Sequence, residues 1–337
     1  MQEIIGRKPE RKELDKLYES GRPEFVAVFG RRRVGKTFLV REHFWGRFTF
    51  YHTAISPADF QDKRSDLKKV QLRAFCTSIQ HYGGDWDETP KDWFEAFGCL
   101  RSLLEQSDKK GRKLVFIDEL PWMDSDQSGF VSALEHFWNS WGAGQPDLML
   151  IVCGSAASWM NDKIINNTGG LYGRLTCEMH LSPFNLGECE RFYQSRGISM
   201  DRYGQVQCYM VLGGIPYYLN YLKPEYSLSE NIDNLFFAKN GRLRKEFERL
   251  YDSLFSHSVK YKEIVRLLST KRSGFTRKEI AEQTSISYNG RLSKMLKALE
   301  NSDFVVSYTY FGGSVRQVYY KLVDRLSLFY LNFINGD

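Results

Sequence analysis

Residues 25–40 read FVAVFGRRRVGKTFLV: an apolar run, a glycine, three arginines, and then Gly-Lys-Thr before apolar residues resume. The run Phe25–Phe29 is typical of a buried strand, and the residues after Thr37 are typical of a helix. GRRRVGKT matches the pattern G-x-x-x-x-G-K-[ST] in the strand–loop–helix setting that this pattern requires. The stretch therefore predicts a phosphate-binding loop.

Each residue type in this loop has a chemical reason. Glycines at positions 30 and 35 let backbone N–H groups approach phosphate oxygens, and the start of the helix adds partial positive charge. We expect Lys36 to reach the β- and γ-phosphates and the Thr37 hydroxyl to ligate Mg²⁺. The predicted nucleotide-binding residues of the loop are Gly30, Arg31, Arg32, Arg33, Val34, Gly35, Lys36, Thr37 and Phe38.

The three loop arginines leave two interpretations open. They form a solvated, charged loop, or at least one of them contacts phosphate or a neighbouring subunit.

A second acidic motif fits the same chemistry. Residues 114–119 read LVFIDE, a buried strand that ends in two acids, 82 residues after Lys36. Asp118 is expected to hold Mg²⁺ through water, and Glu119 to orient or deprotonate the attacking water. Ligands of open α/β sheets sit at the carboxyl ends of the strands, where this pair lies.

The first two hundred residues alternate between strand and helix patterns. Strands are predicted at 47–54, 114–119 and 147–154, and helices at 66–81, 90–106 and 130–141. Such alternation predicts an α/β fold, a P-loop NTPase with a doubly wound, mostly parallel sheet. The aromatic residues Trp93, Phe94 and Phe97 are interpreted as core.

Composition indicates a soluble globular protein. The 337 residues allow two or three domains, and 42% are hydrophobic while 26% are charged. No window approaches a transmembrane span, and the N-terminus carries charge from residue 3 without a signal-peptide core. Six scattered cysteines without a CxxC pair favour buried free thiols and a cytoplasmic location, with no membrane partner.

Charge divides the chain unevenly. Residues 238–337 hold 18 Lys and Arg against 10 Asp and Glu, a net of +8, whereas the rest has a net of −2. We expect residues 1–200 to form the ATPase core and 201–256 a helical lid. Residues 257–337 are expected to form a winged helix-turn-helix domain, with helices at 260–268, 276–283 and 287–299 and strands at 304–311 and 315–322.

A domain of this kind can place its third helix in the major groove of double-stranded DNA, with basic side chains on phosphates. The alternative is that the basic face is simply solvated. The candidate nucleic-acid residues are Tyr288, Asn289, Arg291, Lys294, Lys297 and Arg316.

Taken together, these motifs resemble the archaeal-type ATPases, of the STAND branch of AAA+-related P-loop NTPases. GRRRVGKT, LVFIDELPWM, LMLIVCGSAASWM, LYGRLTCEMHLSPF and GGIPYYL carry the resemblance, with YYKLVDRLSLFYLNFI near the end of the chain. It runs from about Ile5 to the C-terminus. It implies ATP and Mg²⁺ as cofactors and ATP hydrolysis as the activity.

The resemblance also implies roles for residues outside the phosphate-binding loop and the acidic motif LVFIDE. Gly6 and Arg7 would cover the adenine, unless they only begin an amphipathic helix. Ser155 would sense the γ-phosphate or the lytic water, unless it only caps a helix. Arg174 would be an arginine finger if the protein assembles, and Gly214 and Pro216 would form the turn beside the nucleotide. No clear sensor-2 arginine is found, which favours a slow switch.

The sequence thus predicts an ATP-binding, Mg²⁺-dependent ATPase whose nucleotide state controls a basic winged helix that binds DNA or a protein partner, with a homo-oligomer possible. One alternative is a nucleotide-binding switch or scaffold with negligible hydrolysis. Another is a DNA-binding regulator whose nucleotide is structural. ATP is preferred over GTP by resemblance. Members of the family often carry a further nuclease-like domain, and whether this chain is truncated or naturally short stays open.

Overall fold

The computed structural model describes residues 2–57, 67–86, 88–108, 111–125, 127–255, 257–311 and 317–334. The chain divides into two compact units. The first holds residues 1–29 and 36–181, and the second holds residues 30–35 and 182–337. The loop 30–35 therefore groups with the second unit although both of its flanking elements lie in the first. The expected three-domain division at residues 200 and 256 stays a prediction.

The first unit is built on a parallel sheet of five strands in the order β2-β3-β4-β1-β5. The strands are β1 (Glu24–Phe29), β2 (Phe48–Thr53), β3 (Lys113–Asp118), β4 (Leu148–Gly154) and β5 (Cys177–His180). β1, β3 and β4 are almost wholly buried, as their continuous apolar runs require when helices cover both faces. The predicted doubly wound parallel sheet is confirmed.

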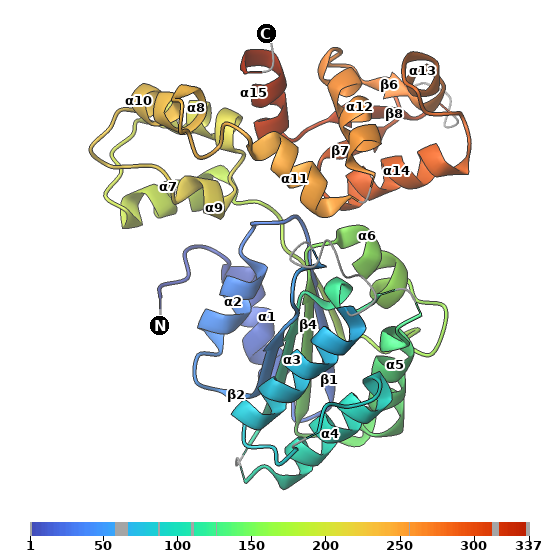
Figure 1. Cartoon of the computed structure of the whole chain (residues 1–337). Helices are drawn as coiled ribbons and strands as arrows, with labels where there is room; N and C mark the ends of the chain where they lie inside the picture. The colour runs from blue at the N-terminus through green and yellow to red at the C-terminus, as the bar shows by residue number, and fades with distance from the viewer. Residues whose placement is uncertain are drawn as a thin grey trace. The chain divides into compact units, whose positions relative to one another are not determined.

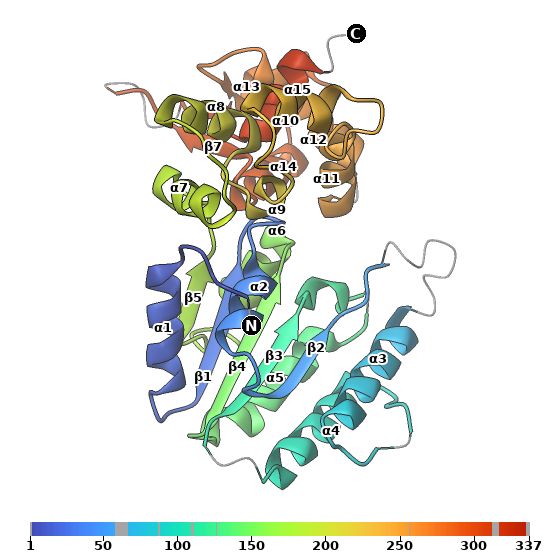
Figure 2. The same cartoon turned by 90° about the vertical axis from the view of Figure 1, so that its left-hand side faces the viewer.

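Helices cover both faces of this sheet (Figures 1 and 2). One face carries α3 (Leu67–His81), α4 (Trp93–Gln106) and α5 (Phe130–Ser140). The other carries α1 (Lys8–Tyr18) and α2 (Lys36–His43). These bounds agree with the predicted helices to within a few residues. The short elements are η3 (Leu120–Trp122), η4 (Gly142–Gly144), α6 (Ala157–Met160) and η5 (Asn161–Ile165).

An aromatic core lies between the sheet and α3–α5. Trp93 and Phe97 are buried there, and Trp93 packs edge-on against Phe75 and Phe130. Phe94, which we expected in the same core, is 49% exposed. The expectation was wrong because adjacent residues on a helix point in different directions, whereas residues four apart share a face.

The second unit begins with a group of helices: α7 (Leu186–Ser195), α8 (Arg202–Leu212), α9 (Pro216–Leu219), α10 (Leu228–Ile232), η6 (Asp233–Phe237) and α11 (Glu246–Leu254). The helical character predicted for residues 201–256 is present. Helix α7 was not predicted. It begins with a capping box in which Asn185 and Glu188 bond each other's backbone N–H groups.

The C-terminal part of this unit combines helices with a small antiparallel sheet in the order β6-β8-β7. Its elements are α12 (Ser258–Ser269), β6 (Phe275–Thr276), α13 (Arg277–Gln283), α14 (Gly290–Asn301), β7 (Val305–Tyr308), β8 (Tyr319–Leu322) and α15 (Arg325–Phe333). Helices and strands are thus present where the sequence predicted them, and the assignment as a winged helix-turn-helix stays a prediction. The predicted strands at 304–311 and 315–322 are shorter here, and residues 312–316 lie outside the described residues.

The third helix starts later than predicted. Its expected start was residue 287, but α14 begins at Gly290 because the Asn289 side chain accepts hydrogen bonds from the backbone of Arg291 and Leu292. Tyr288 and Asn289 therefore precede the helix. The capping box predicted at Thr276 and Glu279 is confirmed at the start of α13.

One buried histidine should make the stability of the first unit depend on pH. His52 on β2 is 3% exposed, its ring lies against Phe75, and its Nδ1 is 2.8 Å from Ser78 Oγ. Burial lowers the pKa of His52 to about 4. The unfolded chain takes up the proton near pH 6.5, so the stabilisation is complete above that pH and is lost as pH falls towards about 4.

We expect the free energy of unfolding of the first unit to fall by about 2 kcal/mol more in wild type than in His52→Phe between about pH 7.5 and pH 5. All seven tryptophans precede residue 160, so tryptophan fluorescence during urea unfolding reports on this unit. Equal pH slopes in the two proteins would contradict the assignment.

Candidate nucleotide-binding site

The backbone of the phosphate-binding loop adopts conformations that its glycines permit. Gly30 and Gly35 have φ of 131° and 92°, which L-residues rarely adopt. A Cβ at Gly35 would meet nothing within 4 Å, so the backbone conformation and not crowding requires glycine there. Arg33, between them, has a φ of 73° without being glycine. Such strain in a non-glycine residue is commonly found at functional sites.

The first unit brings a hydroxyl and a carboxylate together at the carboxyl edge of the sheet. Thr37, on the first turn of α2, donates a 2.8 Å hydrogen bond to Asp118 Oδ2 at the end of β3. Asp118 is 2% exposed, and burial and the charge of Glu119 raise its pKa, partly offset by the bond from Thr37. Adjacent hard oxygens of this kind fit Mg²⁺. Within the described residues, no cluster of three or more His, Cys, Asp or Glu side chains that could hold a metal ion is found.

Glu119 is held by the residue that follows β4. Its Oε2 accepts hydrogen bonds from the backbone N and the hydroxyl of Ser155, at 3.1 and 2.8 Å. Glu119 itself has a φ of 53°, a left-handed conformation. Gly154 allows this approach, because a Cβ there would lie 2.8 Å from Pro121 in the segment after Glu119. The fold thus joins two predicted catalytic residues that are 36 positions apart in sequence.

Lys36 lies at the start of α2 and is 5% exposed. Its position directly after Gly35 is the one that the phosphate-loop pattern requires. The structure thus places Lys36 and Thr37 on the first turn of α2 and Asp118 and Glu119 at the end of β3, and their roles stay predictions.

Arg31 is buried within the second unit. Its guanidinium forms an ion pair with Asp324, and both side chains are less than 5% exposed. Asp324 also caps α15 by accepting hydrogen bonds from the Ser327 backbone and hydroxyl. Phe304 packs against the guanidinium, with 4.7 Å between its ring centroid and Arg31 Cζ. Burial disfavours the charge on Arg31, but the nearby Asp324 carboxylate outweighs this and raises its pKa.

Arg33 makes the second such contact. It forms an ion pair with Glu246, a buried acid at the start of α11. The Tyr218 hydroxyl donates a 2.8 Å hydrogen bond to the same carboxylate, and the Tyr217 ring centroid lies 4.4 Å from Arg33 Cζ. Burial raises the pKa of Tyr218 to about 12, so it remains a donor at neutral pH. Neither arginine is therefore simply solvated.

These two tyrosines belong to the GGIPYYL segment. Gly214 has a φ of 66°, and a Cβ there would lie 2.2 Å from the carbonyl oxygen of Phe184. Only glycine fits this close approach, which Phe184 N–H and Gly214 carbonyl seal with a 2.8 Å hydrogen bond. Pro216 then begins α9, as the proline preference of a first helical turn predicts. The turn therefore presents Tyr217 and Tyr218 to the loop arginine.

The remaining predicted nucleotide-site residues lie elsewhere in the first unit. Gly6 and Arg7 both have positive φ directly before α1, and Arg7 pairs with Glu10 at 3.5 Å. Arg174 is exposed and precedes β5. Because β5 runs parallel to β1 with Cys177 opposite Val26, Arg174 lies before β5 at the amino edge of the sheet. Thr37 and Asp118 lie at the opposite, carboxyl edge.

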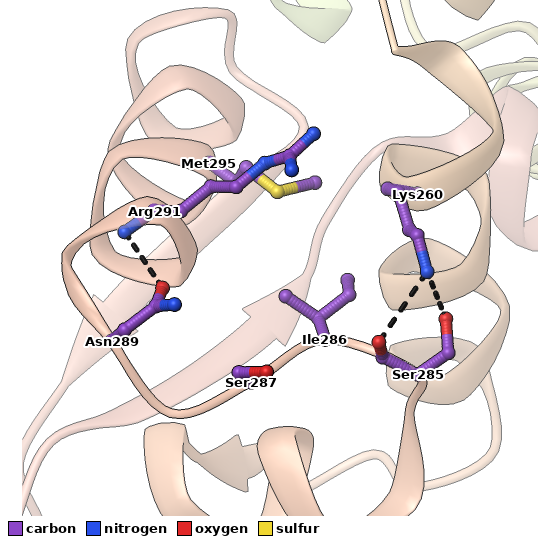
Figure 3. A pocket seen from close by; sticks show the side chains of 7 residues that line it. All are labelled: Lys260, Ser285, Ile286, Ser287, Asn289, Arg291 and Met295. Carbon is purple, nitrogen blue, oxygen red and sulfur yellow. Dashed lines mark hydrogen bonds between the residues drawn. The ribbon is translucent and has the colours of Figure 1, made fainter.

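Tyr288, Asn289 and Arg291 lie at the start of α14. A cavity of about 200 Å³ is lined by Lys260, Ser285, Ile286, Ser287, Asn289, Arg291 and Met295, whose side chains are drawn in Figure 3. Lys294 is on the same helix, and Lys297 lies 3.8 Å from Glu300. Arg277 packs on the Tyr288 ring at 4.2 Å. Arg316 lies outside the described residues.

The profile of a family described as an ATPase domain predominantly from Archaea matches residues 5–222, more than half of the chain. The chain belongs to the archaeal-type ATPase family. This match confirms the resemblance seen in the motifs and places the protein among the ATPases. In the described residues, no helix has the length and apolar character needed to cross a membrane.

Several known proteins are similar to this chain. An uncharacterised protein of Methanocaldococcus jannaschii is 24% identical over 338 residues, covering 98% of this chain and 69% of that protein. The solved Walker-type ATPase of Pyrococcus abyssi has a TM-score of 0.69 at 20% identity, with 98% of this chain and 96% of that chain covered. The Aeropyrum pernix ORC2 protein, in ADPNP–ADP complexes, has a TM-score of 0.57 at 14% identity, with 98% and 94% covered. These likenesses show the fold.

Reading the sequence missed the acids that engage the loop of this ATPase. Asp324 and Glu246 lie 293 and 213 residues from their arginine partners, beyond the reach of local patterns. A weak signal existed, because Asp324 stands in the N-cap position directly before an apolar helix. No sequence rule links such a cap to an arginine in a distant loop.

Breaking the buried pair should loosen the C-terminal helix of the ATPase. Removing one partner of a buried ion pair costs about 3–5 kcal/mol because it leaves an uncompensated charge. We expect Arg31→Met to lower the free energy of opening of α15 by about 3 kcal/mol. The measurement is hydrogen exchange of α15 amides in the ATPase without nucleotide.

Two controls accompany this measurement. Arg101 forms an exposed pair with Glu105 one helical turn away, so Arg101→Met should change exchange by no more than about 1 kcal/mol. Asp324→Asn retains a capping side chain, and combining it with Arg31→Met should cost less than the two single changes added. Strict additivity would show that the pair is not coupled.

Proposed function

We propose that this ATPase binds ATP with Mg²⁺ and that its nucleotide state controls the C-terminal basic domain. One observation carries the proposal: the loop with the phosphate-binding pattern is ion-paired through Arg31 and Arg33 to the starts of α15 and α11. A loop that changes shape with its ligand would change these pairs, and a ligand shifts an equilibrium through such differential contacts. The ADPNP and ADP in the ORC2 complexes support adenine nucleotides as ligands.

The nucleotide site would work through residues already close together. Backbone N–H groups of residues 30–37 and the Lys36 ammonium would hold the phosphates. Thr37 and Asp118 would hold Mg²⁺, which supplies positive charge against the phosphate oxygens when bound. Glu119 would orient the attacking water and accept its proton, while Ser155 holds that carboxylate in place. Gly6, Arg7, Gly214 and Pro216 would border the nucleotide.

Arg174 would act only in an assembly. Because Arg174 lies at the amino edge of the sheet and not at the carboxyl edge with Thr37 and Asp118, its role as an arginine finger requires a second copy of the chain. A homo-oligomer is therefore part of this proposal, and a monomeric ATPase would leave Arg174 without that role.

The basic domain would bind double-stranded DNA. The net charge of +8 in residues 238–337 and the order of α12, α13, α14 and the β-hairpin support it. Arg291 and Lys294 on α14 would contact phosphates first. A protein partner is the other candidate for this surface.

The hydrolysis step is tested by Glu119→Gln. The amide keeps the size of the side chain but cannot accept a proton, so ATP turnover should fall at least about 100-fold while ATP binding persists. Steady-state hydrolysis and nucleotide binding are measured on the same preparations. Glu135→Gln, a change of an acid on α5 of the first unit, serves as control.

A second arm tests the link to DNA. Turnover is measured with and without duplex DNA at two salt concentrations, and stimulation that weakens with salt supports the coupling. Negligible turnover with intact ATP binding would favour the alternative, a nucleotide switch without hydrolysis. The two hydrogen bonds from Ser155 support that alternative, because a Glu119 carboxylate that stays bound to Ser155 is not available to the attacking water. ATP turnover that does not change when DNA is added would favour a protein partner, and not DNA, as the ligand of the basic domain.

A further inference from the structure

The small C-terminal sheet has one face that its own core does not cover. Along β7 and β8, Val305 and Leu322 are buried in the core, whereas Val306 and Lys321 are exposed. Val306 pairs with Lys321, and Tyr308 pairs with Tyr319. Because side chains alternate along a strand, these four share the outer face. We call them, together with Tyr310, the wing face.

Three tyrosine rings form a cluster on the wing face. The Tyr310 ring centroid lies 4.6 Å from that of Tyr319 and 5.5 Å from that of Tyr308, nearly perpendicular to both. The Tyr308 hydroxyl donates to the carbonyl of Ser273, which holds its ring in place. Tyr310 remains 46% exposed, and Phe311 next to it is fully exposed. Preordered aromatic rings on a sheet are the kind of platform on which bases stack.

The charge around the wing face is cationic. Lys321 is exposed on the face itself, and Arg272 is exposed next to Ser273. Glu279, in the first turn of α13, accepts hydrogen bonds from the backbone and hydroxyl of Thr276 and lies 3.5 Å from Lys271. The face therefore joins exposed π surfaces to positive charge, which suits a phosphate backbone with accessible bases.

We propose that the wing face binds single-stranded nucleic acid by stacking unpaired bases on Tyr310 and Phe311. This inference deepens the proposed function, on which it rests, by naming the form of nucleic acid that the hairpin takes. Bases paired in a duplex keep their faces stacked on each other, so only unpaired or splayed bases can lie on these rings. Lys321 and Arg272 would neutralise the phosphates of the same strand.

The experiment measures binding of fluorescein-labelled DNA of about 20 nucleotides by anisotropy, using the full chain with ATP and Mg²⁺. The probes are a thymine-rich single strand, a duplex of the same length, and that duplex with a central mismatched bubble. Stacking contributes about 1–3 kcal/mol per base, so Tyr310→Leu should weaken single-strand and bubble binding between roughly fivefold and 150-fold. Duplex binding should hardly change.

Matched variants separate stacking from simple apolar contact. Tyr310→Phe keeps the ring and should bind like wild type, whereas leucine keeps only the apolar volume. Phe311→Leu should behave like Tyr310→Leu. Tyr172→Leu replaces another exposed tyrosine, in the first unit, and should change nothing.

The possible failures are distinguishable. Equal single-strand affinity for wild type, Tyr310→Leu and Phe311→Leu would overturn the inference. Binding of the duplex as tightly as the bubble would also overturn the inference. If Arg291→Ala and Lys294→Ala then weaken duplex binding, the proposed DNA-binding function stands without the inference about the wing face. Binding to none of the probes would overturn both the inference and the DNA role, and would assign the surface to a protein partner.

Discussion

The buried ion pair between Arg31 and Asp324 is the constraint on which the second unit depends most. A guanidinium with so little exposure is stable only with a carboxylate beside it, and that carboxylate also caps α15. The same arginine lies in the loop that carries the phosphate-binding pattern. A residue of the predicted ligand site is therefore also a structural residue of the C-terminal unit, and Arg33 repeats the arrangement at α11 with Glu246. Few changes in loop conformation could leave both contacts intact.

The rest of the nucleotide site follows from the parallel sheet. Parallel strands release their loops at one edge, which brings Asp118 to Thr37 and Ser155 to Glu119. At this edge a larger residue than glycine at position 154 would clash with its neighbours, and Glu119 adopts a left-handed backbone conformation. Both features restrict which residues can occupy the edge. A similar steric restriction holds at Gly214, where only a glycine lets the turn approach Phe184 closely. The turn then brings the Tyr218 hydroxyl to Glu246.

Much of the fold could be predicted because its signals are local. The apolar runs of β1, β3 and β4 and the amphipathic patterns of α3 and α5 lie within single windows, and their observed bounds agree within a few residues. Phe94 was misplaced because the window contained three aromatic residues and the helical phase was not applied to each. The late start of α14 was missed because the Asn289 side chain caps the helix by hydrogen bonding to its first backbone N–H groups. The periodic pattern of apolar residues carries no information about such a cap.

The sequence by itself determined the strand–loop–helix of residues 25–40, the acid pair after β3 and membership of the archaeal-type ATPases, because each depends on residues close in the chain. Only the tertiary structure decided where the loop arginines go and which residue holds Glu119. It also decided that Arg174 lies at the amino edge of the sheet and that three tyrosines gather on the wing face. The physical reason is that ion pairs and ring contacts join residues hundreds of positions apart, and their pairing is set by how the units fold.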